Sequence, residues 1–353
     1  MSVHRRDLLK AAGAFAAVAG TLSWPALAAG RIAPFANPLG PRSRVIYVND
    51  LSGDIDGLFA TAHMLMSTTS QLRGIVGSAA MMPAESSEAA ALLGREIVGL
   101  MGMAGKVPVH VGASGRFGKE RVAQRSPGVQ AIIDEAMRSD TDLPLFIAVG
   151  GGLTEVASAL AIEPAIAERA TLVWIGGGSW PDGVQHEYNF MLDSEAARFL
   201  FNDTRIPIWT IPAAVYATCV VSGTELQEHV APHGRIGAWL YKTWADYPNV
   251  LSRNLPPGFK FRLNTGEVWI LGDSPLAVLT SLADPIPNFD GRKLAYNRTS
   301  AGHYDEVICP MLNPDGTFAP RAEGRKVRIY KDIDTRLMFG DFFSKLAVNF
   351  PAR

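Results

Sequence analysis

The chain has 353 residues, a formal net charge of −1 and two cysteines, Cys219 and Cys309. The nearly balanced charge without a basic run excludes a surface built for nucleic acid or for an anionic membrane. Two cysteines exclude a disulfide framework and a cysteine-based metal site, although the two thiols could pair with each other or stay buried and free. We expect the partners of this protein to be small molecules.

The first 28 residues have the pattern of a twin-arginine signal peptide. Arg5 and Arg6 precede an apolar run, and small residues at 26–28 offer a cleavage site. A membrane anchor is the alternative, but glycines interrupt the run and it ends at Trp24-Pro25. We therefore expect twin-arginine export to the periplasm or the exterior, with no stable membrane anchor after cleavage. Cleavage after residue 28 removes three basic and one acidic residue, which leaves 30 basic and 33 acidic residues and a net charge of −3.

Residues 29–44 are rich in Pro, Gly and Ala and are predicted to be a linker, and residues 45–353 a single domain. In that domain strand-like and helix-like segments alternate, and several strands are continuously apolar, which is typical of a sheet buried on both faces. The sequence predicts an α/β fold with a mostly parallel central sheet and helices on both faces. The predicted strands are 45–49, 72–77, 107–111, 145–149, 171–175, 207–211, 267–271 and 327–334, and the predicted helices are 58–66, 86–103, 128–138, 153–160, 194–201, 235–244 and a closing helix that ends near 346.

The chain is organised around residues 45–59, where an apolar strand, a glycine turn and the start of a helix follow one another. Asp50, Asp54 and Asp56 lie within seven residues there, and their charges repel unless a cation, a substrate hydroxyl or a shared proton stabilises them. The carboxyl end of a parallel strand is where open α/β sheets bind ligands. We predict a Ca²⁺ site here; the alternative is that Asp54 or Asp56 only caps the next helix.

This stretch resembles the amino-terminal signature of the nucleoside hydrolases, in the variant with a longer Asp-x-Gly-Gly-Asp-Pro-Asp-Asp loop. Asp50, Gly53, Asp54 and Asp56 fit the loop, whereas Gly57 stands at its final Asp, a metal ligand in the family. The resemblance implies the open-sheet fold of that family, Ca²⁺ as the cofactor, and hydrolysis of ribonucleosides to ribose and base. It also places Asp54 and Asp56 against the substrate, and leaves open which of them replaces the ligand missing at Gly57.

Two further turns complete the predicted metal site. The strand at 145–149 runs into Gly150-Gly151-Gly152-Leu153-Thr154, which resembles the family's Thr-Gly-Pro-Leu-Thr segment, and the resemblance assigns a metal-ligating main-chain carbonyl to Gly150. Asp273 precedes a helix that starts with Pro, so alone it would be a helix cap. Within the resemblance it is the remaining carboxylate ligand. The family often has His just before this Asp as the leaving-group acid, and here that position is Gly272.

The predicted sugar contacts are Glu187 and Asn189, in a stretch that resembles the family's Glu-Phe-Asn segment. On an extended loop, two residues at this spacing project to one side and could hold sugar hydroxyls together. The alternative is a capped helix start near Asp193 with Glu187 exposed.

An aromatic stripe at Trp239, Tyr241 and Trp244 follows helical spacing. Such a stripe is more often part of a core than a platform for a ligand. The resembling family, however, closes its base pocket with a helix from this part of the chain, so we predict that these rings contact the base.

Asp50 is the predicted catalytic base, because in the family pattern it lies both on the metal and near the attacking water. With Gly272 in place of His, the leaving-group acid is open, and the candidates are His186, Tyr241 and Tyr247. The glycine departures also keep two alternatives open: a periplasmic nucleoside- or sugar-binding protein or inactive homologue, and a hydrolase of another riboside. Oligomeric state is open too, with a homo-oligomer among the alternatives.

Overall fold

A computed structural model describes residues 34–183, 186–254, 267–286 and 297–352, with the backbone alone for 248–254. Within these residues nine strands form one sheet in the order β3-β2-β1-β4-β5-β6-β13-β10-β9. Neighbouring strands are parallel from β3 to β13, and β10 pairs antiparallel with β13 and β9. The predicted mostly parallel α/β fold is confirmed. The strands are β1 (Ser43–Asn49), β2 (Ser70–Gly77), β3 (Val109–Val111), β4 (Leu145–Gly150), β5 (Ala170–Ile175), β6 (Ile208–Ile211), β9 (Asn297–Thr299), β10 (Gly302–Ile308) and β13 (Lys326–Ile333).

The order of the strands reverses at β1. From β1 the chain adds β2 and β3 on one side, then returns to add β4 and β5 on the other. At such a switch point the loops that follow two neighbouring strands diverge, which opens a crevice at their carboxyl ends. The loops that border this crevice begin at Asp50 and Gly151.

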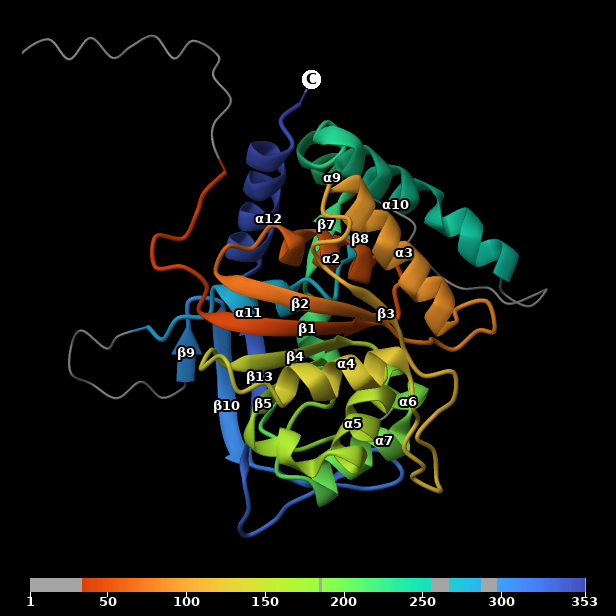
Figure 1. Cartoon of the computed structure of the whole chain (residues 1–353), viewed down its shortest axis with the longest axis vertical. Coiled ribbons are helices and arrows are strands. Elements are labelled where there is room, and N and C mark those ends of the chain that lie inside the picture. The colour runs from red at the N-terminus through yellow and green to blue at the C-terminus, as the bar shows by residue number, and fades with distance from the viewer. Residues whose placement is uncertain (1–33, 184–185, 255–266, 287–296, 353) are drawn as a thin grey trace, which may run out of the picture. The chain divides into compact units, whose positions relative to one another are not determined.

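Alternate residues of β1 pack into two different cores. Val45 and Tyr47 belong to a core with α2, α3 and α9 to α12, whereas Ile46 and Val48 belong to a core with α4, α5 and α7. The sheet is therefore buried on both faces, and Figure 1 shows α3, α10 and α12 on one side of it and α4, α5 and α7 on the other. The helices are α2 (Asp56–Leu65), α3 (Ser87–Leu100), α4 (Pro127–Ala136), α5 (Thr154–Ile162), α6 (Tyr188–Leu192), α7 (Ser194–Asp203), α8 (Ala213–Tyr216), α9 (Gly223–His229), α10 (Gly234–Asn254), α11 (Pro275–Ser281) and α12 (Thr335–Asn349).

Local sequence explains where the helices beside the crevice begin. The Ser86 hydroxyl accepts a hydrogen bond from the Ala89 amide at the start of α3, and Ser126 caps α4 in the same way, with Pro127 as its first residue. A serine cap satisfies an amide that would otherwise lack a partner, and proline loses nothing at the first helical position. The loops from the strand ends to these helices are thus fixed at both ends.

The structure differs from the sequence prediction in several elements, of which the following concern the strands. Ser43 and Arg44, predicted as linker, begin β1, and the buried Arg44 guanidinium donates to Glu135 Oε1 at 2.6 Å. The strand predicted at 267–271 is present as β8 (Val268–Ile270), but it pairs antiparallel with β7 (Val220–Ser222) outside the main sheet. The strands β9 and β10 were missed because, at an edge of the sheet, they are only partly buried and lack an apolar run.

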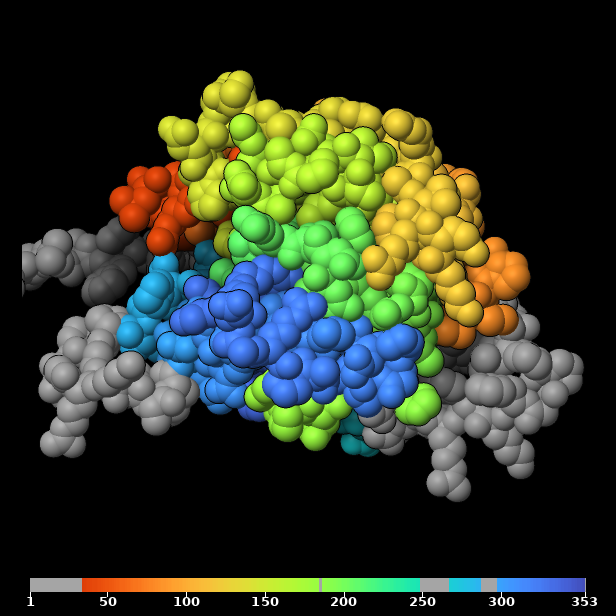
Figure 2. All heavy atoms as spheres, turned by 90° about the horizontal axis from the view of Figure 1, so that it is seen from below, coloured from red at the N-terminus to blue at the C-terminus, as the bar shows by residue number. Residues whose placement is uncertain are grey.

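A short hairpin of β11 (Met311–Leu312) and β12 (Phe318–Ala319) covers α7. Figure 2 shows the blue carboxyl-terminal part of the chain, to which this hairpin belongs, beside the green middle part, to which α7 belongs. Residues from Pro34 onward group into one compact unit, and the predicted signal peptide at 1–28 lies outside the described residues. In the part that is described, no helix has the length and apolarity needed to cross a membrane. Cys219 and Cys309 are both buried and unbonded to each other.

Candidate active site

The ends of β1 and β4 meet the segment before α11 through one side chain, Asn49. Its Nδ2 donates to the Gly150 carbonyl at 2.6 Å and to Asp273 Oδ2 at 2.6 Å. The Asp50 amide also approaches the Gly150 carbonyl, at 3.4 Å. Residues far apart in the sequence are thereby joined at the carboxyl edge of the sheet.

The loop after β1 places Asp54 and Asp56 differently. Asp56 begins α2, where its Oδ1 accepts from the Gly57 amide at 2.8 Å and its Oδ2 from the Asp273 amide at 3.1 Å. A carboxylate at a helix amino terminus is favoured by the unpaired amides there. Asp54 is exposed, and its Oδ1 accepts from the Ile55 amide. Asp56 therefore joins Asp273 to α2, while Asp54 lies at the outer rim.

Burial governs the protonation of this cluster. It holds the pKa of Asp50 and of Asp273 well above the usual range, and the charge of Asp56 raises both further. Burial also raises the pKa of Asp56 to about 6. Among the ion pairs of the described residues, none involves Asp50, Asp56 or Asp273. Such a cluster needs a proton or a cation to be stable at neutral pH.

The donor chemistry fits a hard cation, although the carboxylates alone do not form the site. No group of three His, Cys, Asp or Glu side chains within the described ranges is placed to hold a metal ion. A Cβ at Gly150 would stand 2.4 Å from each Asp273 carboxylate oxygen, so glycine keeps the space around its carbonyl clear. The buried Asn49 Oδ1 has no partner among the described residues. Carboxylate, carbonyl and amide oxygens are the ligands that Ca²⁺ takes.

Glu187 and Asn189 differ in setting from the sequence expectation. They do not lie on an extended loop: Glu187 is buried and caps the short helix α6, accepting from the Asn189 and Phe190 amides at 3.1 and 2.8 Å. The Asn189 side chain donates to the Ile175 carbonyl at 2.8 Å. Burial raises the pKa of Glu187 to about 7. The alternative was right about the capped helix start, because Asp193 accepts from the Ala196 amide at 3.2 Å at the start of α7, but wrong about Glu187, because a carboxylate that accepts helix amides can be buried.

The model of the family described as inosine-uridine preferring nucleoside hydrolase matches residues 45–308. The chain belongs to this family. It is thus a hydrolase of nucleoside N-glycosidic bonds, and a small-molecule nucleoside is its substrate. The metal dependence that is general in nucleoside hydrolases agrees with the oxygen donors above.

Solved structures show the same fold. The purine-preferring ribonucleoside hydrolase from Gardnerella vaginalis has a TM-score of 0.65 and 18% identity, covering 88% of this chain and 99% of its own. The plant nucleoside hydrolase PpNRh1 has a TM-score of 0.60 and 18% identity, covering 87% of this chain and 99% of its own. No curated protein matches the chain.

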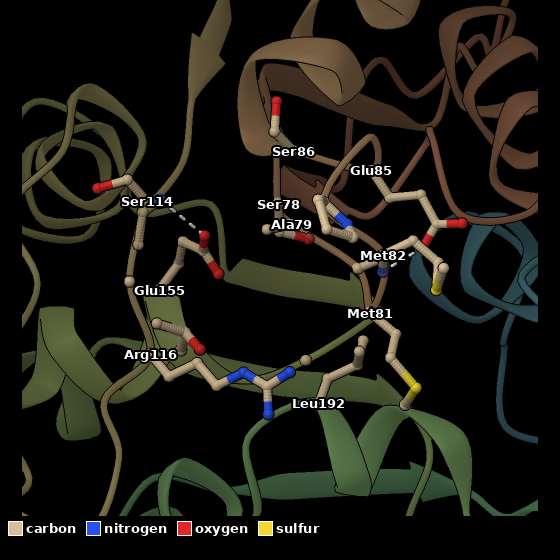
Figure 3. Close-up of a pocket in the computed structure, with 16 residues that line it drawn as sticks. Ser78, Ala79, Met81, Met82, Glu85, Ser86, Ser114, Arg116, Glu155 and Leu192 are labelled. Carbon is tan, nitrogen blue, oxygen red and sulfur yellow. Dashed lines mark hydrogen bonds between the residues drawn. The ribbon is translucent and has the colours of Figure 1, made fainter. Parts of the chain in front are cut away.

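A cavity of about 260 Å³ in this nucleoside hydrolase adjoins Asp50. A Cβ at Gly151 would stand 3.3 Å from both Asp50 Oδ1 and the Oγ of Ser78, and Ser78 lines the cavity. The buried Ser78 hydroxyl has no partner within the described part of the chain. Figure 3 shows the loop after β2 forming one wall, and Arg116 and Glu155 pointing into the space from the other side.

Glu155 is a site residue that the sequence analysis missed. It is 2% exposed, and its Oε1 accepts from the Ala113 amide at 2.9 Å. Burial raises its pKa to about 7. Near neutral pH a protonated carboxyl can therefore donate a hydrogen bond into the cavity. Only its position next to a glycine turn could have drawn attention to it.

Tyr216 was missed as well. A Cβ at Gly272 would stand 3.2 Å from the Tyr216 ring, and the Tyr216 hydroxyl donates to Glu187 Oε1 at 3.0 Å. The ring therefore fills the space beside Gly272, the position at which the family resemblance implies a His. Burial holds the pKa of Tyr216 far above its usual value, so the hydroxyl stays protonated.

The aromatic stripe lies on α10, as predicted, and its rings pack against the core. Trp239, Tyr241 and Trp244 are each partly buried, and Tyr241 and Trp244 have centroids 5.7 Å apart. The residue of α10 that reaches the carboxylate loop is Tyr247, whose hydroxyl donates to the Gly53 carbonyl at 2.6 Å. The role of the stripe in binding the base stays a prediction. His186 is exposed, next to Glu187.

Proposed function

We propose that this protein is a Ca²⁺-dependent ribonucleoside hydrolase that releases ribose and a free base. The observation that carries the proposal is that the Asn49 side chain joins Asp273 to the Gly150 carbonyl, with Asp50 next in the chain, at the switch point of the sheet. All of these groups offer oxygen, and no ion pair of the described residues balances the charge of the carboxylates when they are ionised. Family membership supplies the reaction class.

When bound, Ca²⁺ would be held by Asp50, Asp273 and the Gly150 carbonyl, and would supply charge that polarises a water and orients sugar hydroxyls. Asp50 is the base in this proposal: it is buried at the mouth of the crevice, and its Oδ1 faces Gly151 on the cavity side. A carboxylate there takes the proton of the attacking water as the bond between the ribose and the nucleobase breaks.

We assign Glu187 and Asn189 to one side of the bound ribose, and Asp54 and Asp56 to its other side. Asp56 has both oxygens on backbone amides, so its position is fixed, and Asp54 at the exposed rim is the carboxylate that we assign to a sugar hydroxyl. The Tyr216 hydroxyl fixes the rotamer of Glu187. Carboxylate and amide side chains together satisfy both the donors and the acceptors of a ribose.

The leaving group is assigned to the cavity beside Ser78. Glu155 and Arg116 point into it, and the Ser78 hydroxyl is free to bond a base edge. A carboxyl that is still protonated near pH 7 can donate to the departing base. A cavity of about 260 Å³ is somewhat small for a drug-sized ligand, which agrees with a single base rather than a whole nucleoside.

A reducing-sugar assay over purine and pyrimidine ribonucleosides tests the proposal. Turnover that EGTA abolishes and Ca²⁺ restores is expected, with Asp50→Asn as the inactive control. Saturable nucleoside binding without release of ribose would instead support the binding-protein alternative. Release of sugar only from ribosides that are not nucleosides would support the alternative of a hydrolase of another riboside.

The proposal includes export. Arg5, Arg6 and the small residues at 26–28 support a twin-arginine signal and an extracytoplasmic location. Mass spectrometry of the protein recovered from the periplasm should give a chain that begins near residue 29. Replacement of both arginines by lysine should leave the uncleaved protein in the cytoplasm. Cleavage that persists in this variant would contradict the twin-arginine assignment.

A further inference from the structure

The position that departs most from the family metal site, Gly57, is filled by another residue. A Cβ at Gly57 would stand 2.0 Å from Asn49 Oδ1, 2.7 Å from its Cγ and 3.0 Å from its Nδ2. Real Cβ atoms essentially never approach so closely, so an aspartate at 57 and the Asn49 side chain as it lies exclude each other. The amide group of Asn49 therefore occupies the space that the missing carboxylate would need.

Asn49 also makes the contacts expected of a ligand in that place. Its amide lies 2.6 Å from the Gly150 carbonyl and 2.6 Å from Asp273 Oδ2, the two groups that the resemblance names as ligands. The side chain is 1% exposed, and its Oδ1 has no partner in the described residues. A buried amide with one end unpaired costs free energy unless something else satisfies it.

The two carboxylates that the sequence offered as replacements are less available. Asp56 has one oxygen on the Gly57 amide and the other on the Asp273 amide. Asp54 is exposed and bonds the Ile55 amide. Neither contacts the Gly150 carbonyl in the hydrogen bonds that are described. Among the hydrogen bonds of the described residues, Asn49 alone joins the Gly150 carbonyl to Asp273.

The oxygen and nitrogen of an Asn amide exchange places by a half-turn about the Cβ–Cγ bond with little change in shape. With Nδ2 inward, the amide bonds Gly150 and Asp273 without an ion. With Oδ1 inward, three oxygens converge, and they repel one another unless a cation lies between them. The same side chain can thus serve the protein with and without its ion.

We propose that Asn49 supplies the metal ligand that Gly57 lacks, its side-chain oxygen joining the Gly150 carbonyl and Asp273 around Ca²⁺. The inference rests on the calcium part of the proposed function. It moves a ligand from the start of α2 to the end of β1 and replaces a charged oxygen by a neutral one. Such a site has one negative charge fewer, which lowers affinity for the ion without changing its oxygen-only character.

Calcium titration by calorimetry of the chelator-treated mature protein tests this, together with thermal unfolding with and without Ca²⁺. Asn49→Ala should weaken binding by about tenfold or more, as loss of support around a metal does. Asn49→Asp has the same shape with an ionised oxygen and should bind at least as tightly as wild type. The double variant Asn49→Ala with Gly57→Asp should recover binding, because the carboxylate then has the room it needs. Asn349→Ala, at the end of α12, is the matched control and should not differ from wild type.

Two results would overturn the inference. If Asn49→Ala binds Ca²⁺ as wild type does, Asn49 is not a ligand. If Ca²⁺ gives wild type neither a heat of binding nor a shift in unfolding temperature, but gives both to the double variant, the Asn49 amino group takes the place of the ion. The absence of binding in every variant would overturn the calcium assignment as well, whereas nucleoside hydrolysis is measured separately and can survive it. Circular dichroism of each variant separates these outcomes from failure to fold.

Discussion

Glu155→Gln should change how the stability of this protein depends on pH. Burial moves the pKa of Glu155 from 4.5 to about 7, and a tenfold change in an equilibrium constant is worth about 1.4 kcal/mol, so ionising this carboxyl in the folded protein costs about 3 kcal/mol. Because the residue is 2% exposed, solvent screening does little to reduce this cost. Gln keeps an oxygen for the Ala113 amide and carries no charge.

The sign follows from the direction of the shift. The folded pKa lies above the unfolded value, so the stabilising contribution is complete below about pH 4.5 and is lost as the pH rises through about 7. At pH 5 the free energies of unfolding of wild type and Glu155→Gln should therefore differ by less than about 1 kcal/mol. At pH 8.5 the variant should be more stable than wild type by about 3 kcal/mol.

Urea unfolding at both pH values measures this difference. Comparing the two proteins cancels the contribution of Glu187, whose pKa is also raised to about 7 and which is present in both. Glu168→Gln changes an exposed glutamate, and its free energy of unfolding should equal that of wild type at both pH values. A stability difference between Glu155→Gln and wild type that is the same at pH 5 and pH 8.5 would refute the reasoning.

Two further predictions concern the substrate. Asn189→Ala should weaken binding of ribose and of ribosides alike, measured by calorimetry; unchanged affinity for every riboside would remove Asn189 from the sugar site. Because Gly272 provides no imidazole, p-nitrophenyl riboside should be cleaved far faster than inosine or uridine, since acid assistance is typically worth about a hundredfold to ten-thousandfold. Comparing both substrate types in wild type and in Glu155→Gln, His186→Ala, Tyr241→Phe and Tyr247→Phe identifies the acid, and equal wild-type rates with all four variants unaffected would place it elsewhere.

The parallel sheet could be predicted because each of its strands can be recognised by its own apolar run, without knowledge of its partners. Residues 145–150 are continuously apolar, and they form β4, buried between two cores. The strand β10, which lies between β13 and the edge strand β9, could not be found this way, because it has polar residues at exposed positions and its pairing with β13 depends on contacts distant in sequence. The strand β8 was found, but nothing in its sequence indicates that its partner is β7 rather than the main sheet.

The sequence predicted the site residues that match a family motif by themselves. It did not predict those whose role depends on which side chain fills the space beside a glycine. Asp50 and Asp273 follow strand ends, and the structure joins Asp273 to Asn49, the residue before Asp50. The position of Asn49 itself, overlapping the space beside Gly57, depends on the distance between β1 and α2. The sequence shows only that a carboxylate is missing at Gly57, whereas the structure shows that the Asn49 side chain lies in its place.

Gly272 and Tyr216 form a second pair of this kind, and it leads to a last prediction. The Tyr216 ring lies beside Gly272, and its hydroxyl donates to Glu187, which favours the ionised form of that carboxyl and lowers its pKa. Tyr216→Phe keeps the ring and removes this hydrogen bond, so the pKa of Glu187 should rise above its present value of about 7.

If ionised Glu187 holds the sugar, the acidic limb of the kcat/KM profile should move to higher pH in Tyr216→Phe, with activity near that of wild type at pH 9. Tyr304→Phe, on β10, is the matched control and should leave the profile unchanged. A uniform loss of activity at all pH values would mean that Tyr216 acts on the substrate directly rather than through Glu187. An unchanged profile would mean that the hydroxyl positions nothing, and that the ring matters only because it fills the space beside Gly272.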